Sequence, residues 1–193
     1  MTVSLAWNLA PPTSSFWSLI EDAIRAWVLA GTGLPQGQAW FADQDIPASE
    51  QAPRVTIRIG GTVHRGLDET RHDYDAGRPA GQEIEFSARG MRELTVDLQA
   101  FAPTLVGPGV TARSLLEAAQ VALSLPTIRE ALNAAGLGVL QEGNVQRIPQ
   151  ARGGMQEDRA TLATRFAVQV SATERTTFIE TVVLDQPLDL EPA

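Results

Sequence analysis

The sequence predicts an α+β protein with a single, mainly antiparallel sheet and helices packed on one face of that sheet. Segments 55–59 and 94–100 alternate strictly between apolar and polar residues, which is typical of strands with one buried face. Segments 13–30 and 112–124 repeat apolar residues at helical spacing. With 193 residues, 44% of them hydrophobic, the chain is long enough to bury a core as one domain.

The first predicted helix, over residues 13–30, has an N-terminal cap and one apolar face. Ser14 or Ser15 can cap it, because a serine oxygen accepts a hydrogen bond from an early helical N–H group. Gly31 and Gly33 follow and are expected to end it. The apolar face consists of Phe16, Ile20, Ile24, Trp27 and Val28.

Two further helices are predicted in the second half of the chain. Thr111 can cap the helix that starts at residue 112. Pro126 breaks this helix and opens a shorter one over residues 127–135. Gly136 and Gly138 are expected to end the shorter helix.

Three more strands are predicted around these helices. Residues 38–42 are a short strand candidate, and residues 139–149 and 160–173 can pair as a hairpin across a turn at 153–158. One face of the last strand carries Leu162, Thr164, Phe166, Val168 and Val170.

We expect residues 1–175 to form a single α+β domain with two unusual segments. Residues 60–90 are rich in glycine, arginine and acidic residues, and are expected to form a long flexible loop or hairpin, because they bury little apolar surface to offset their ordering entropy. Residues 176–193 are acidic, contain prolines and are expected to form an extended C-terminal arm.

Composition narrows the class of protein. The formal net charge is −8, which is unlike that of a nucleic-acid-binding protein. The chain has no lysine, so its 15 basic residues are all arginine, and it has no cysteine, which excludes disulfides and thiolate chemistry. The N-terminus lacks the basic region of a signal peptide, and no apolar run is long enough for a transmembrane helix.

One cluster of imidazoles and carboxylates is the strongest candidate for a metal site or a catalytic site. Its side chains suit metal ligation, but their spacing fits no motif of known geometry, and the surrounding glycines leave the segment unable to preorganise a site. A solvated, charged loop is therefore the preferred interpretation. The cluster consists of His64, Asp68, Glu69, His72, Asp73 and Asp75.

Other possible sites are weaker. Asp43 and Asp45 offer two carboxylates near a strand end, but an aspartate at such a position also stabilises a turn through nearby backbone N–H groups. Neither Gly60-Gly61 nor Gly153-Gly154 is followed by the Lys-Ser or Lys-Thr of a phosphate loop, and no nucleophile elbow or His-Glu-x-x-His motif occurs. We therefore predict no enzyme activity and no cofactor.

The order of elements, together with four short matches, resembles the tailed-bacteriophage neck or tail terminator family. The similarity covers residues 13–175: a helix with tryptophan, strands separated by a charged loop, a helix pair and a long C-terminal strand. The matching stretches are Trp40 to Asp45, Pro53 to Ile59, Gly66 to Glu69 and Arg92 to Phe101.

The resemblance implies a virion structural protein without a reaction. Members of this family form rings, here expected to be homo-hexameric, that end tail-tube polymerisation and join the tail to the head and neck. The implied partners are other copies of the chain, the tail-tube protein and a neck or head-completion protein. DNA passes through the ring's channel, and no membrane is involved. The expected location is the tail and neck of the virion, after assembly in the host cytoplasm.

The subunit interface is expected to use charged residues of the two unusual segments. The planar guanidinium of arginine suits bidentate contacts with carboxylates of a neighbouring chain. The residues expected at this interface are Arg65, Arg71, Arg78, Arg89, Asp185, Asp189 and Glu191.

Two alternatives remain open from the sequence. The chain can instead be a tail-tube or head-completion subunit, which belongs to the same broad class. It can also be a metal-dependent hydrolase that uses His64, His72 and Asp73.

Overall fold

The structure of the protein is a computed structural model in which the chain divides into two compact units. Unit 1 contains residues 1–9, 69–89 and 171–193, and unit 2 contains residues 10–68 and 90–170. The described residues are 14–44, 53–79, 82–103, 110–148, 150–152 and 155–176. The predicted arm over residues 176–193 therefore lies almost wholly outside the described residues.

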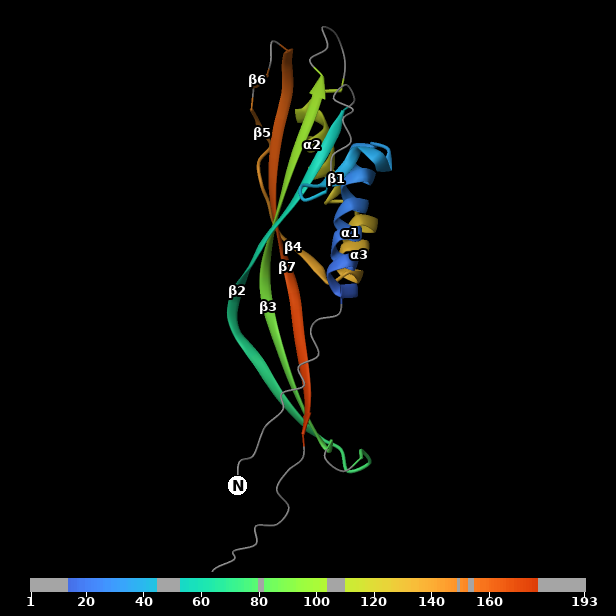
Figure 1. The fold of residues 1–193 in the computed structure, drawn as a ribbon, viewed down its shortest axis with the longest axis vertical. Coiled ribbons are helices and arrows are strands. Elements are labelled where there is room, and N and C mark those ends of the chain that lie inside the picture. Colours follow the sequence, from blue (N-terminus) through green and yellow to red (C-terminus); the bar gives the residue numbers. More distant parts are fainter. Residues whose placement is uncertain are drawn as a thin grey trace, which may run out of the picture. The chain divides into compact units, whose positions relative to one another are not determined.

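Along the chain, two helices come first, then three strands, a pair of helices and four further strands (Figure 1). The helices are α1 (Ser14–Thr32), the short 3-10 helix η1 (Gln36–Gln38), α2 (Ala112–Ala122) and α3 (Pro126–Ala134). The strands are β1 (Ala39–Phe41), β2 (Arg54–Tyr74), β3 (Ile84–Pro103), β4 (Leu137–Glu142), β5 (Gln146–Arg147), β6 (Gln150–Arg152) and β7 (Met155–Thr176). None of the described helices combines the length and the apolar character needed to span a membrane.

The strands form one mainly antiparallel sheet in the order β1-β2-β3-β7-β4, which confirms the predicted α+β class. β5 and β6 also pair with β7, and β4, β5 and β6 are all antiparallel to it. β1 is parallel to β2, with Ala39 opposite Val55. The connection between β2 and β3 is too short for a parallel crossover and is closed by a 2.9 Å hydrogen bond from Asp75 N to Glu83 O.

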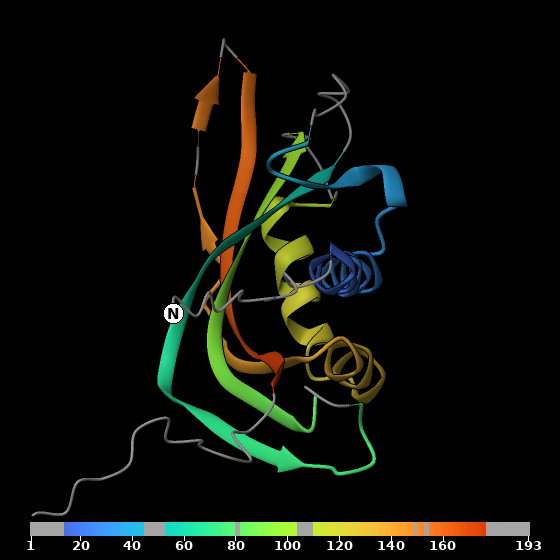
Figure 2. The same ribbon diagram turned by 60° about the horizontal axis from the view of Figure 1, so that its bottom comes forward.

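In unit 2 the three helices lie on one face of the sheet, as the sequence predicts (Figures 1 and 2). The predicted apolar face of α1 lies there, with Phe16 only partly buried and its other members buried. The inward residues of β3 and β7 pack in the same core, because strand residues alternate between the two faces. The largest buried side chains are Trp27, Phe166, Ile20, Ile24, Ile57, Leu94, Leu98, Leu116, Leu123, Leu132, Leu137 and Leu162.

Helices α1 and α2 approach each other closely at Gly31. A Cβ atom on Gly31 would lie 2.7 Å from Ala119 Cα, so no larger residue fits without displacing a helix. The buried Trp27 indole donates a 2.8 Å hydrogen bond to Ala119 O in the same region. Gly31 therefore lies inside α1, and the prediction that it ends the helix is wrong. Gly33, with a φ of 67°, follows the end of α1 instead.

The start of α2 is held by two sets of hydrogen bonds. Thr111 Oγ1 accepts from Ser114 N at 3.0 Å and Ser114 Oγ accepts from Thr111 N at 3.0 Å, which confirms Thr111 as the cap. Asp158 of β7 is buried, and its Oδ2 accepts from Ala112 N at 2.9 Å. A carboxylate at a helix N-terminus satisfies an orphan N–H group and complements the helix dipole. Asp158 therefore fixes α2 to the sheet.

Several strands are longer than predicted. β2 continues past the predicted end at residue 59 to Tyr74, in agreement with the hairpin alternative for residues 60–90, and residues 61–72 are all exposed. Alternation cannot be recognised in a strand that buries neither face, so its sequence resembles that of a loop. The predicted turn at 153–158 is also wrong in part, because β7 already begins at Met155.

We predict that Gly31→Ala destabilises the protein, although alanine is the better helix former. The new Cβ meets the α2 backbone, and overpacking of this kind costs about 1–3 kcal/mol of the free energy of unfolding. Urea denaturation measures the change. Gly37→Ala is the matched control, because nothing lies within 4 Å of a Cβ there. Equal stability of Gly31→Ala and the natural chain would contradict the close α1–α2 contact.

Candidate subunit interface

Glu93 of β3 binds arginines from both neighbouring strands. Its Oε2 accepts a 2.8 Å hydrogen bond from Arg65 Nε of β2, and its Oε1 lies 3.3 Å from Arg165 Nη1 of β7. The carboxylate is nearly buried, whereas Arg65 and Arg165 keep half or more of their side-chain surface exposed. Glu93 thus ties three strands of unit 2 together.

Asp68 of β2 forms a second network in unit 2. Its two oxygens accept from Arg92 Nη1 at 2.8 Å and Nη2 at 2.9 Å, and its Oδ1 lies 2.9 Å from His64 Nε2. The hydrogen bonds from Arg92, with a smaller contribution from His64, hold the pKa of Asp68 well below its usual value. The same contact raises the pKa of Arg92.

This bidentate pair lies directly over Gly90. A Cβ atom on Gly90 would overlap Asp68 Oδ1 and the Arg92 guanidinium, so a larger residue here would have to displace the ends of these two side chains.

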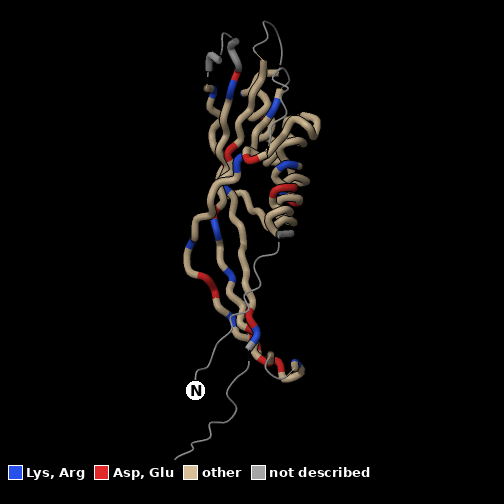
Figure 3. Tube along the Cα trace, in the orientation of Figure 1, with Lys and Arg blue, Asp and Glu red and all other residues tan. Residues whose placement is uncertain are grey.

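Unit 1 contains its own ion pairs. Arg78 lies 3.5 Å from Asp75 Oδ2 and 3.3 Å from Glu85 Oε2, and Arg175 Nε lies 3.2 Å from the same Glu85 oxygen. Arg71 pairs with Asp73 at 3.1 Å. Figure 3 shows acidic and basic positions interspersed along the strands in both units. Exposed ion pairs of this kind orient the side chains but add little to the free energy of unfolding.

The residues expected at the subunit interface are placed as follows. Arg65, Arg71 and Arg78 each bind a carboxylate of their own chain, and Arg89 is exposed. The acidic members of the set, Asp185, Asp189 and Glu191, lie outside the described residues. The interface role of these residues stays a prediction.

The histidines of the predicted cluster make different contacts. His64 binds Asp68, and the His72 ring lies 4.4 Å from the Phe86 ring. Asp73 is paired with Arg71. In the part of the chain that the structure describes, no group of three or more imidazoles and carboxylates is arranged to hold a metal ion.

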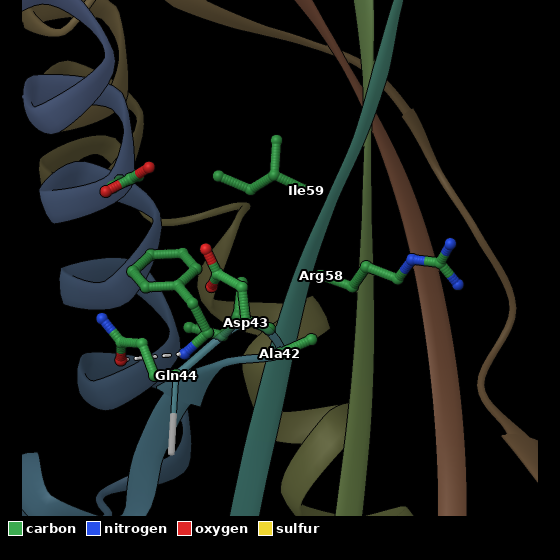
Figure 4. A pocket seen from close by; sticks show the side chains of 8 residues that line it. Ala42, Asp43, Gln44, Arg58 and Ile59 are labelled. Atoms are coloured by element: carbon green, nitrogen blue, oxygen red, sulfur yellow. Dashed lines mark hydrogen bonds between the residues drawn. The ribbon is translucent and has the colours of Figure 1, made fainter. Parts of the chain in front are cut away.

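An open hollow of about 360 Å³ lies between α1 and the strands β1 and β2 (Figure 4). Gln44 Oε1 accepts a 3.3 Å hydrogen bond from Phe41 N, which fixes the turn after β1. The Arg25 guanidinium lies 4.7 Å from the Phe41 ring centroid. Asp43 is exposed here and Arg58 extends to the other side of β2, while Asp45 lies outside the described residues. The arrangement fits the turn interpretation of this segment.

Sequence reasoning missed a stacked group on the open face of the sheet. The guanidinium groups of Arg54 and Arg159 lie 4.6 Å and 5.2 Å from the centroid of the Phe101 ring. Arg159 Nη2 also donates to Gln99 Oε1 at 2.7 Å. The alternation of β3 could have predicted this group. Leu98 and Ala100 are buried, so Gln99 and Phe101 lie together on the opposite face.

Comparison with known proteins gave one family match. Residues 18–189 match the family described as "Phage neck terminator protein". No curated protein matches the chain. Among solved structures, the chain is similar to the sheath/tube terminator of an extracellular contractile injection system, PVC, in its extended state, with 17% identity and a TM-score of 0.46. The similarity covers 90% of this chain, which spans only 65% of the length of that chain.

We predict that Asp68→Asn destabilises the protein at pH 7 and that the difference shrinks in acid. A pKa lowered by folding gives stabilisation that is complete above the unfolded value, about 3.9, and is lost as the pH falls toward the folded value. Urea denaturation between pH 7 and pH 2.5 measures it. With Arg92→Gln in the background, the pH dependence due to Asp68 should largely disappear. A difference that does not change with pH would contradict the network.

Proposed function

The chain belongs to the family of phage neck terminator proteins, and from this premise we propose that it forms a ring that ends tail-tube polymerisation and joins the tail to the head. The match over residues 18–189 carries the proposal, because it covers nearly the whole chain. The protein is a structural component of the phage tail. The proposed role includes no reaction and no cofactor.

The proposed ring is a homo-hexamer with a central channel that DNA crosses. Its other partners are the tail-tube protein on one side and a neck or head-completion protein on the other. Assembly takes place in the host cytoplasm, and the ring remains in the tail and neck of the virion. The net charge of −8 supports the proposed DNA channel, since like charge disfavours adhesion of DNA to the protein.

The exposed part of β2 supports contact with other subunits. Residues 61–72 are exposed, although a strand of this length normally buries one face. Arg65 and Arg71 keep 57% and 67% of their side-chain surface exposed, so each can bind a second carboxylate. We propose that Arg65 and Arg71, together with Arg78 and Arg89, meet acidic residues of a neighbouring subunit, namely Asp185, Asp189 and Glu191.

The test combines the purified chain with the virion. Native mass spectrometry and negative-stain microscopy of the full chain should show a discrete ring, and immunogold labelling should place it at the head-proximal end of the tail. Hollow filaments of indefinite length would instead indicate a tail-tube subunit. A monomer at every concentration, with no label at the tail end, would contradict the proposal.

A further inference from the structure

The outer edge of β2 is open over residues 58–68 in unit 2. β1 pairs with β2 only from Val55 to Ile57, and no other described strand continues on that side. A strand edge without a partner presents a row of N–H and C=O groups that can pair with another chain. Gly66, with a φ of 73°, interrupts the extended backbone, so the regular edge runs over residues 58–65 and is long enough to accept a further strand of about seven residues.

Charged residues usually protect such an edge, and Arg58 is exposed there, but two other charged residues of the edge are bound by the chain itself. Arg65 is bound to Glu93, and Asp68 is bound to Arg92, so both side chains are directed to β3. Val63 and Leu67 remain exposed, with 56% and 96% of their surface accessible. Leu67 is nearly fully exposed and lies beside these ion pairs. An apolar residue surrounded by polar groups is typical of an anchor residue in a protein–protein interface.

The chain contains one segment with a matching sequence. Residues 178–184 read Phe-Ile-Glu-Thr-Val-Val-Leu and are mostly apolar or β-branched, which is typical of a strand. They follow the last described strand, β7, which ends at Thr176. Residues 185–193 then add three carboxylates and no basic group.

We propose that residues 178–184 of one copy add as a strand to the edge of β2, residues 58–68, in a second copy. In unit 1, β3 lies between β7 and β2, so a strand beside the outer edge of β2 there is about 14 Å from the end of β7 at 4.7–4.9 Å per strand. Only Thr177 separates β7 from the segment, and two residue steps span about 7 Å.

The proposed contact joins unlike surfaces. β2 and β7 lie on opposite sides of β3, so each copy offers its segment to one neighbour and its β2 edge to the other. Such head-to-tail contacts close into rings when the rotation between copies closes. The inference therefore rests on the proposed ring and assigns the surface that holds it together.

Two full-chain variants test the two halves of the contact. Leu67→Arg changes the edge, and the double variant Ile179→Asp with Val183→Asp changes the segment. Each should raise the concentration of half-assembly by about tenfold or more, as expected for an anchor residue, measured by analytical ultracentrifugation. Leu19→Arg is the control for the edge, because Leu19 is an exposed leucine of α1, and Leu190→Asp is the control for the segment.

Mixing the two variants is the sharper test. One intact edge and one intact segment remain in the mixture, so the variants should form heterodimers but no closed rings. Normal assembly of either variant alone, or no heterodimer in the mixture, would overturn the proposal.

Hydrogen exchange locates the contact independently of ring formation. A synthetic peptide of residues 177–193, added to the full-chain double variant, should slow amide exchange within residues 58–68, whereas a scrambled peptide should not. Protection there without rings of the natural chain would contradict the proposed function but support this contact. Rings without such protection, or protection only on adding tail-tube protein, would overturn the contact and leave the proposed function intact.

Discussion

The contact between α1 and α2 is the interaction on which the core of unit 2 depends. Trp27 donates its indole N–H to Ala119 O at 2.8 Å, and Gly31 allows the two backbones to meet. At this separation the buried residues of both helices share one core with the inner face of the sheet. Asp158 then fixes the start of α2 to β7. One contact therefore joins the two helices to each other, and the other joins α2 to the sheet.

The exposed part of β2, residues 61–72, contacts β3 through ion pairs and buries none of its side chains. Arginines 65 and 92 bind carboxylates across β2 and β3, and these pairs set side-chain positions while burying little surface. They also leave Val63 and Leu67 in solvent. A strand edge without a partner can in general pair with another chain.

The sequence predicted those parts of the fold that bury one face. The alternation in 94–100 and 160–173 and the helical spacing in 13–30 gave the correct class and most of the core, since burial leaves a periodic pattern. For residues 60–90 the sequence left a flexible loop and a hairpin open, because no face of β2 is buried beyond residue 60. The packing role of Gly31 depends on its contact with Ala119, which is far away in the sequence, so no local pattern predicts it. Asp158 was predicted in a turn, although the alternation of β7 places it on the inner face.

Electron cryomicroscopy of the tail end of the virion tests the central claim most directly. The account predicts a closed ring of this chain at the head-proximal end of the tail. Within that ring, density should continue from the end of β7 in each subunit to the outer edge of β2 in the next. A tail end without this chain, or a ring in which the edge of β2 is covered by anything other than residues 178–184 of a neighbour, would contradict the account.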